Sequence, residues 1–258
     1  MSKNAYFSGI VSGLIVLVLS VGTASATHSW GGYHWARKAN PFTLKVGNNM
    51  TSTWNSYLNT AISDWTTSTV LDLTKVTGGT NSKSCRATTG RVEACNYRYG
   101  NNGWLGIAQI WITADNHITK GAMKMNDTYF GASTYNTPAW RQLVVCQELA
   151  HTFGLDHQDE DFTNPNLETC MDYTSDPTTN QHPNQHDFDE LVSIYTHLDS
   201  LNTAFQSTNP SSGQAAGESD DPQTWGHDRK RDGHNKVSHF ERQLGKGDRV
   251  MTFVVWAE

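Results

Sequence analysis

The sequence lacks an excess of basic residues, with 19 lysines and arginines against 25 aspartates and glutamates and a net charge of −6 at pH 7. Nucleic acids and anionic membranes are bound through basic surfaces. The GxGxxG and P-loop signatures that hold phosphates are absent as well. The composition therefore argues against a nucleic-acid partner, an anionic-membrane partner and a phosphate-binding loop.

Long apolar runs are also lacking, except at the N-terminus. Lys3 precedes an apolar run over residues 10–21, and Ala24-Ser25-Ala26 offers the small residues of a signal-peptide cleavage site. The run is short for a membrane span, although an anchor is the alternative interpretation. Residues 1–26 are therefore predicted to be a signal peptide. The mature protein is expected to be secreted, extracellular and free of the membrane.

Cysteine is scarce, and the four residues are Cys85, Cys95, Cys146 and Cys170. Exported proteins meet an oxidising environment, so these thiols are expected to pair, and four cysteines allow three pairings. A catalytic thiol is the alternative, but no cysteine–histidine pattern singles one out.

Hydrophobic periodicity predicts one helix and three strands before the centre of the chain. The strands are expected over residues 42–46, 70–76 and 105–112, and residues 85–95 are expected to form an irregular segment. The helix is expected over residues 51–67, because apolar residues recur at helical spacing on one face. These residues are Trp54, Leu58, Ala61, Ile62 and Trp65.

The centre of the chain carries a motif with metal-binding spacing, QELAHTFGLDH from Gln147 to His157. On a helix Gln147 and His151 lie on one face, with Glu148 beside them. Gly154 can take the left-handed conformation that ends a helix, which returns His157 toward the same point. Three donor groups beside a carboxylate are what a zinc hydrolase needs: three ligands, an open position for water and a general base.

This motif resembles the zinc signature of the metzincin metallopeptidases, HExxHxxGxxH followed by a Met-turn, with Gln147 in place of the first histidine. Cys170-Met171-Asp172-Tyr173 is similar to the Met-turn. The resemblance is to secreted bacterial metzincins of the matrixin or snapalysin type and covers residues 40–205. It implies an α+β fold with a twisted mixed sheet, a backing helix, an active-site helix opened by Thr137-Pro138, and a C-terminal helix over residues 188–205.

The resemblance also implies a role for each residue of the motif. His151 and His157 would bind one catalytic Zn²⁺, and Glu148 would be the general base. Met171 would form an apolar floor beneath the metal. Tyr173 lies where astacin-like members carry a tyrosine that stabilises the oxyanion, and a packing role is the alternative.

Gln147 is the one departure from the signature. Its amide oxygen is a weaker donor toward zinc than an imidazole nitrogen. Three interpretations follow: a working Gln-His-His site of reduced affinity, a site completed by water or by another residue, and an inactive relative.

Two further features follow from the resemblance. A disulfide between Cys146 and Cys170 would tie the active-site helix to the Met-turn, and one between Cys85 and Cys95 would close a short loop. An edge strand, either residues 105–112 or the strand near Met123, would pair with an extended polypeptide substrate.

Two other groups contain residue types that bind metals. His182 and His186 form a second metal site or the entry of a helix, and no set of histidines matches the structural zinc site of matrixins. The other group offers oxygen ligands to Ca²⁺ or forms a solvated loop: Asp156, Asp159, Glu160 and Asp161.

The domain organisation follows from composition. Residues 27–205 are predicted to be the catalytic domain, residues 206–223 a linker, and residues 224–258 a tail that docks on that domain or forms a small binding element. The sequence thus predicts a secreted, monomeric zinc endopeptidase. The competing interpretation is a pseudopeptidase that binds peptides or a surface without cutting.

Overall fold

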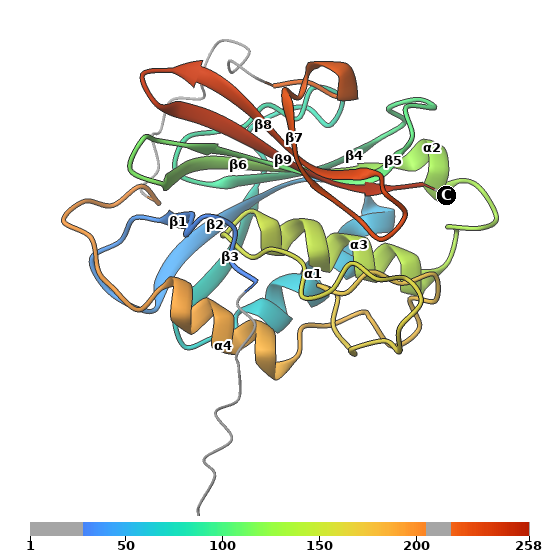
Figure 1. Ribbon diagram of the computed structural model, residues 1–258, viewed down its shortest axis with the longest axis horizontal. Helices are drawn as coiled ribbons and strands as arrows, with labels where there is room; N and C mark the ends of the chain where they lie inside the picture. The colour runs from blue at the N-terminus through green and yellow to red at the C-terminus, as the bar shows by residue number, and fades with distance from the viewer. Residues whose placement is uncertain (1–27, 205–217, 258) are drawn as a thin grey trace, which may run out of the picture.

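A computed structural model describes residues 28–204 and 218–257 of the chain. The predicted signal peptide and most of the predicted linker lie outside these residues. The described chain is a mixed α+β structure in which one sheet lies over a layer of helices (Figure 1). Among the described residues no helix is long and apolar enough to cross a membrane.

The sheet has nine strands in the order β3-β2-β4-β6-β5-β9-β8-β7, and β1 also pairs with β6. Its first six strands are β1 (His34–Trp35), β2 (Phe42–Asn49), β3 (Leu71–Thr77), β4 (Val92–Tyr97), β5 (Trp104–Ile112) and β6 (His117–Asn126). Strands β1, β2, β3, β4 and β6 pair in parallel, whereas β5 is antiparallel to β6. The two predicted strands before residue 80 and the strand over residues 105–112 are present.

Helices α1, α3 and α4 lie on one face of the sheet, with α1 and α3 directly beneath it and α4 below them, whereas α2 lies at the end of the strands (Figure 1). Their bounds are η1 (Ser52–Trp54), α1 (Asn55–Trp65), α2 (Asp127–Phe130), α3 (Pro138–His151) and α4 (Gln185–Ile194). The predicted apolar stripe is buried except for Ile62, which is partly buried, and Trp65 Nε1 donates to Cys146 O over 3.2 Å. This contact joins α1 to α3, so the backing helix supports the helix that carries the metal-binding motif.

The C-terminal residues belong to the same sheet. After η2 (Pro222–Thr224) they form β7 (His227–Arg231), β8 (Val237–Gly245) and β9 (Asp248–Trp256). Strand β9 runs antiparallel to β5 along its length, from Trp104 opposite Trp256 to Ile112 opposite Arg249. Alternate residues of β9 therefore face the helices, and Met251, Phe253 and Val255 enter the main core.

The predicted irregular segment over residues 85–95 is wrong in its second half, where β4 begins at Val92. Glu93 interrupts the apolar pattern of this strand, yet its side chain is fully buried. Thr88 donates to it over 2.6 Å and Arg91 over 2.7 Å. A charge paired by neighbouring residues can occupy a central strand, which the alternation of residue types did not indicate.

The predicted C-terminal helix is too long. Helix α4 ends at Ile194, and Leu198, within the predicted helix, is 56% exposed. The guanidinium of the fully buried Arg37 donates to the carbonyls of Tyr195 and His197. These carbonyls are thereby held by a tertiary contact, and the chain leaves the helical path.

Candidate active site

Helix α3 begins and ends where its sequence requires. The Thr137 hydroxyl accepts from Trp140 N over 3.2 Å, and Pro138 occupies the first helical position. Beyond the helix, Gly154 has φ +102°, and a Cβ there would lie 2.1 Å from Tyr33 O. Only glycine fits this turn, which returns the chain to bring His157 back toward His151.

The two histidines converge through the same ring atom. His151 Nε2 lies 2.9 Å from His157 Nε2. His151 Nδ1 lies 2.8 Å from Leu155 O, and His157 Nδ1 lies 2.5 Å from Glu160 Oε1. Because a carbonyl and a carboxylate accept hydrogen bonds, each Nδ1 is the donor and each Nε2 presents a lone pair. Burial lowers the pKa of both imidazoles well below the usual value, which favours the neutral form that binds metals.

Gln147 and Glu148 lie beside this pair on α3, and both are fully buried. Neither side chain has a hydrogen-bond partner for any of its polar atoms among the described residues. Burial raises the pKa of the Glu148 carboxyl well above its usual range. Buried polar atoms are nearly always paired, so four unpaired atoms beside two lone pairs fit a cation and its water. The residues present therefore fit a zinc ion.

The Met-turn segment is held against this motif. Cys146 and Cys170 form a disulfide with Cα atoms 5.9 Å apart, and Gln158 N donates to Met171 O over 2.6 Å. The Met171 side chain is fully buried. The second predicted disulfide, between Cys85 and Cys95, is formed as well.

Tyr173 packs against one of the histidines, with ring centroids of Tyr173 and His157 4.3 Å apart. Its hydroxyl donates to Val254 O in β9 over 3.1 Å. Burial raises the pKa of this phenol well above its usual value, so the group is a hydrogen-bond donor and not an anion. In this conformation its donor is used by the C-terminal strand.

The C-terminal strands bring two residues to the site that sequence reasoning missed. Phe253 of β9 stacks on His151, with ring centroids 4.3 Å apart, and both side chains are fully buried. His239 of β8 is fully buried, and its ring centroid lies 5.2 Å from that of His157 and 6.3 Å from that of His151. A single histidine in a strand beyond a predicted linker carries no sequence signal for this position.

His239 also belongs to a charged cluster with Asp156, His157 and Glu160, whose ligand atoms lie within 4.8 Å of one another. His239 Nε2 is 2.9 Å from Asp156 Oδ1, and Lys230 Nζ lies 3.0 Å from Asp156 Oδ2 and 3.4 Å from Glu160 Oε1. Burial alone would raise the pKa of Asp156, but the hydrogen bond and charge of His239 lower it below the usual range. Lys230 therefore already supplies a cation to these two acids.

The remaining metal candidates from the sequence are separated by the fold. The Asp159 carboxylate accepts a hydrogen bond from Asp161 N over 2.7 Å, and the Asp161 carboxylate accepts one from Thr163. The carboxylates of Asp156 and Glu160 instead pair with Lys230. His182 lies 2.7 Å from Asp64, and the ring of His186 stacks on His28.

The expectation of an edge strand for substrate is wrong for both candidates. Strand β6 lies between β4 and β5, and β5 lies between β6 and β9. The pairing of β5 with β9 uses the edge that the shorter, six-strand sheet would leave free. The sequence could not indicate this, because strand pairing between distant segments is decided by tertiary contacts.

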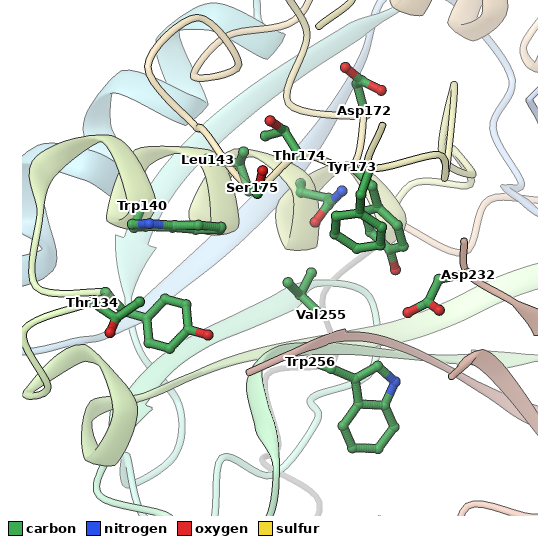
Figure 2. Close-up of a pocket in the computed structure, with 13 residues that line it drawn as sticks. Thr134, Trp140, Leu143, Asp172, Tyr173, Thr174, Ser175, Asp232, Val255 and Trp256 are labelled. Carbon is green, nitrogen blue, oxygen red and sulfur yellow. The ribbon is translucent and has the colours of Figure 1, made fainter. Parts of the chain in front are cut away.

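A pocket remains open beside the site (Figure 2). Gln147 lines it together with Trp140 and Leu143 of α3, Tyr173 beyond the Met-turn, and Val255 and Trp256 of β9. Its wall is thus made partly by α3 and partly by the C-terminal strand β9.

Comparison with known proteins gives only distant likenesses. No family model matches the chain. No curated protein matches it either. Among solved structures, that of myroilysin has a TM-score of 0.38 at 11% identity over 63% of this chain and 96% of that one. High choriolytic enzyme 1, a hatching enzyme zinc-protease from Oryzias latipes (Medaka fish), has a TM-score of 0.37 at 9% identity over 65% of this chain and 96% of that one.

Proposed function

We propose that this chain is a zinc-dependent endopeptidase of the metzincin type. One observation carries the proposal: the Nε2 atoms of His151 and His157 face each other across 2.9 Å, beside the buried and unpaired carboxylate of Glu148. Hydrolytic zinc sites combine imidazole ligands, an open coordination position and an adjacent base. The HExxHxxGxxH-like spacing and the Met-turn-like segment of the sequence support the same assignment.

Each residue of the site has a chemical role in this proposal. Zinc, when bound, would supply a Lewis acid that polarises the scissile carbonyl and acidifies water. Glu148 takes a proton at its carboxylate and delivers it to the leaving amine. Burial raises the pKa of this carboxyl, and a carboxylate with a raised pKa is a stronger base. Tyr173 donates its hydroxyl hydrogen to the oxyanion once Val254 O no longer accepts it.

The third donor is Gln147 or His239. Gln147 occupies the position that the motif assigns to a ligand, and both of its amide atoms lack partners. His239 offers a nitrogen, the better donor toward zinc, and lies next to His157. Because Asp156 Oδ1 lies 2.9 Å from His239 Nε2, we favour Gln147 as the donor in the conformation described.

The C-terminal strand governs access to this site. Strand β9 pairs with β5 along its length and covers the side of β5 that would otherwise be an open edge. Phe253 covers His151 from the same strand. Cleavage therefore requires β9 to separate from β5 near the site, so the C-terminal residues restrain the enzyme.

A second function is favoured by the same strand. A chain whose substrate edge is permanently filled, and whose first ligand is glutamine, would bind peptides in the pocket of Figure 2 without cutting them.

Secretion is also part of the proposal. It rests on the leader-like sequence and on two disulfides, which persist in oxidising compartments.

The test compares wild-type protein with Glu148→Ala, both purified without chelator or metal-affinity resin. We expect cleavage of an unfolded protein to fall by at least 10²–10⁴-fold while bound zinc is unchanged, because Glu148 is the base and not a ligand. Asp189→Ala, an exposed acid on α4, is the control and should retain full activity. Zinc-loaded wild-type protein that binds unfolded peptides but cleaves none would favour the binding module.

A further inference from the structure

A second cluster of histidines lies where β1, the start of β6 and the chain after α4 meet. His34 of β1 is the register partner of His117 of β6. His197 and Asp199 follow α4, and this part of the chain rises from α4 toward β1 (Figure 1). None of these four residues belongs to the candidate active site.

The three histidines converge on one carboxylate oxygen, Asp199 Oδ1. Asp199 Oδ1 lies 3.3 Å from His117 Nε2, 3.5 Å from His34 Nε2 and 3.7 Å from His197 Nε2. The Nε2 atoms of His34 and His197 are 3.1 Å apart. Zinc bonds of about 2.0–2.2 Å in a tetrahedron place neighbouring ligand atoms about 3.3–3.5 Å apart. The separations among His34, His197 and Asp199 are therefore close to those of ligands around one small cation, and these three groups all lie within 4.8 Å of one another. His117 contacts Asp199 but does not belong to this group of three.

The surroundings orient two of the ligands. His34 Nδ1 lies 2.7 Å from Gly32 O, so Nδ1 carries the proton and the Nε2 lone pair faces the cluster. Asp199 Oδ2 accepts from Arg37 N over 3.1 Å and from Arg37 Nη1 over 2.9 Å, which leaves Oδ1 for the histidines. A ligand whose other polar atom is held in this way is fixed in position before the metal binds.

Hydrogen bonds alone offer a competing account. His197 Nε2–H could donate to His34 Nε2, and His117 Nε2–H to Asp199 Oδ1. In this arrangement the single lone pair of His34 Nε2 accepts from His197, and no hydrogen lies between His34 Nε2 and Asp199 Oδ1, which are 3.5 Å apart. The carboxylate also has Arg37 as a counter-ion, so charge balance by itself requires no metal. Only the account with a metal site predicts that zinc binds to this cluster.

We propose that His34, His197 and Asp199 hold a second zinc ion, which has a structural role. Two imidazole nitrogens and one carboxylate oxygen suit zinc and not calcium, which takes oxygen ligands. The site joins the first strand to the chain beyond α4, and the side chain of His197 is 54% exposed. His117 lies beside the site, with its Nε2 atom 3.3 Å from Asp199 Oδ1.

The experiment counts zinc in wild-type protein and in His197→Ala after loading with Zn²⁺ and removal of free metal. His182→Ala is the matched control, because its side chain is 58% exposed and pairs with Asp64 outside the cluster. We expect His197→Ala to bind one equivalent less than wild type and His182→Ala to bind the same amount. This difference of one equivalent is independent of whether the candidate active site is filled.

Two measurements guard against misfolding of the variant. Asp199→Asn keeps the shape of the side chain and should weaken zinc binding at this site by tenfold or more in a chelator competition. Added Zn²⁺ should raise the Tm of wild type by an increment that His197→Ala lacks, whereas Ca²⁺ should not. Equal zinc content in folded wild type and His197→Ala, with equal Tm shifts, would overturn the proposal.

Discussion

The imidazole of His151 lies flat against the phenyl ring of Phe253, with centroids 4.3 Å apart and ring planes inclined by 7°. His151 belongs to the helix that carries the metal-binding motif, and Phe253 belongs to the last strand of the sheet. A residue proposed to bind zinc is therefore covered by the C-terminal end of its own chain.

Weakening the side-chain packing on the outer face of β9, away from α3, should increase the rate of peptide cleavage. Val254 is fully buried in a cluster with Trp225 and Phe240, away from α3. Val254→Ala should lower the free energy of unfolding by about 2 kcal/mol. It should also raise the rate of peptide hydrolysis, because the Tyr173–Val254 end of β9 detaches more often.

The matched control is Val250→Ala, at the other end of the same strand. Val250 is 1% exposed and packs against Trp111 and the Cys85–Cys95 disulfide. We expect a similar loss of stability without the rise in hydrolysis. Equal rises in both variants would indicate general loosening of the fold, and no rise in either would show that β9 does not limit access.

Replacing glutamine by histidine at position 147 should strengthen zinc binding. An imidazole nitrogen is a better donor to zinc than an amide oxygen, and both side chains are neutral as ligands. Gln147→His should raise zinc affinity tenfold or more, which is about 1.4 kcal/mol. Activity at limiting zinc should rise with it. A competition titration against a calibrated chelator measures the change.

His239→Ala decides whether the third donor comes from the motif or from β8. If Gln147 is the donor, His239→Ala leaves zinc affinity within a few-fold of wild type while Gln147→Ala lowers it. The reverse pattern would assign the third position to His239 and make Gln147→His ineffective.

The disulfide between Cys146 and Cys170 should protect the metal site more than the rest of the domain. In the chain-entropy model, replacing both cysteines by alanine costs about 3 kcal/mol of unfolding free energy. We expect zinc to be lost to a chelator at lower concentration, because α3 is no longer tied to the Met-turn segment. Removing the Cys85–Cys95 disulfide should destabilise the protein to a similar extent and leave zinc affinity unchanged, as urea unfolding and chelator titration would reveal.

The stability of the protein should fall as pH rises through the titration of Asp187. Burial raises the pKa of this carboxyl to about 6 from a usual 3.8, with Thr169, Asn184 N and His186 opposing the shift. The folded state therefore binds a proton more tightly than the unfolded state between these values. The stabilisation is complete below pH 4 and is lost as pH rises through 6.

Asp187→Asn should remove this dependence. The variant should match wild type near pH 4 and exceed its unfolding free energy at pH 7.5 by about 3 kcal/mol. The amide oxygen can still accept from Asn184 N, which donates to Asp187 over 2.8 Å. Asp189→Asn, an exposed acid on the same helix, is the control, and urea unfolding across pH is the measurement. Parallel pH profiles for wild type and Asp187→Asn would refute the assignment.

Local patterns in the sequence were sufficient for the motif and its helix. The cap at Thr137, the proline at 138 and the glycine at 154 act on their own neighbours, so the ends of α3 could be placed before the structure was known. The spacing of His151 and His157 predicts that their side chains converge, because one helix and the turn after it set the relative positions of the two residues. The apolar stripe of α1 follows from the same periodicity.

Tertiary structure decided what surrounds that motif. Whether β5 is an edge depends on β9, more than a hundred residues away, and strand pairing at that distance has no local signature. The placement of His239, Phe253 and the His34–His117–His197–Asp199 cluster depends on the same long-range packing. In the sequence, a single histidine or phenylalanine of a strand has the same appearance in an ordinary core as beside a metal site. The sequence therefore determined the chemistry of the helix, and the fold determined which residues surround it.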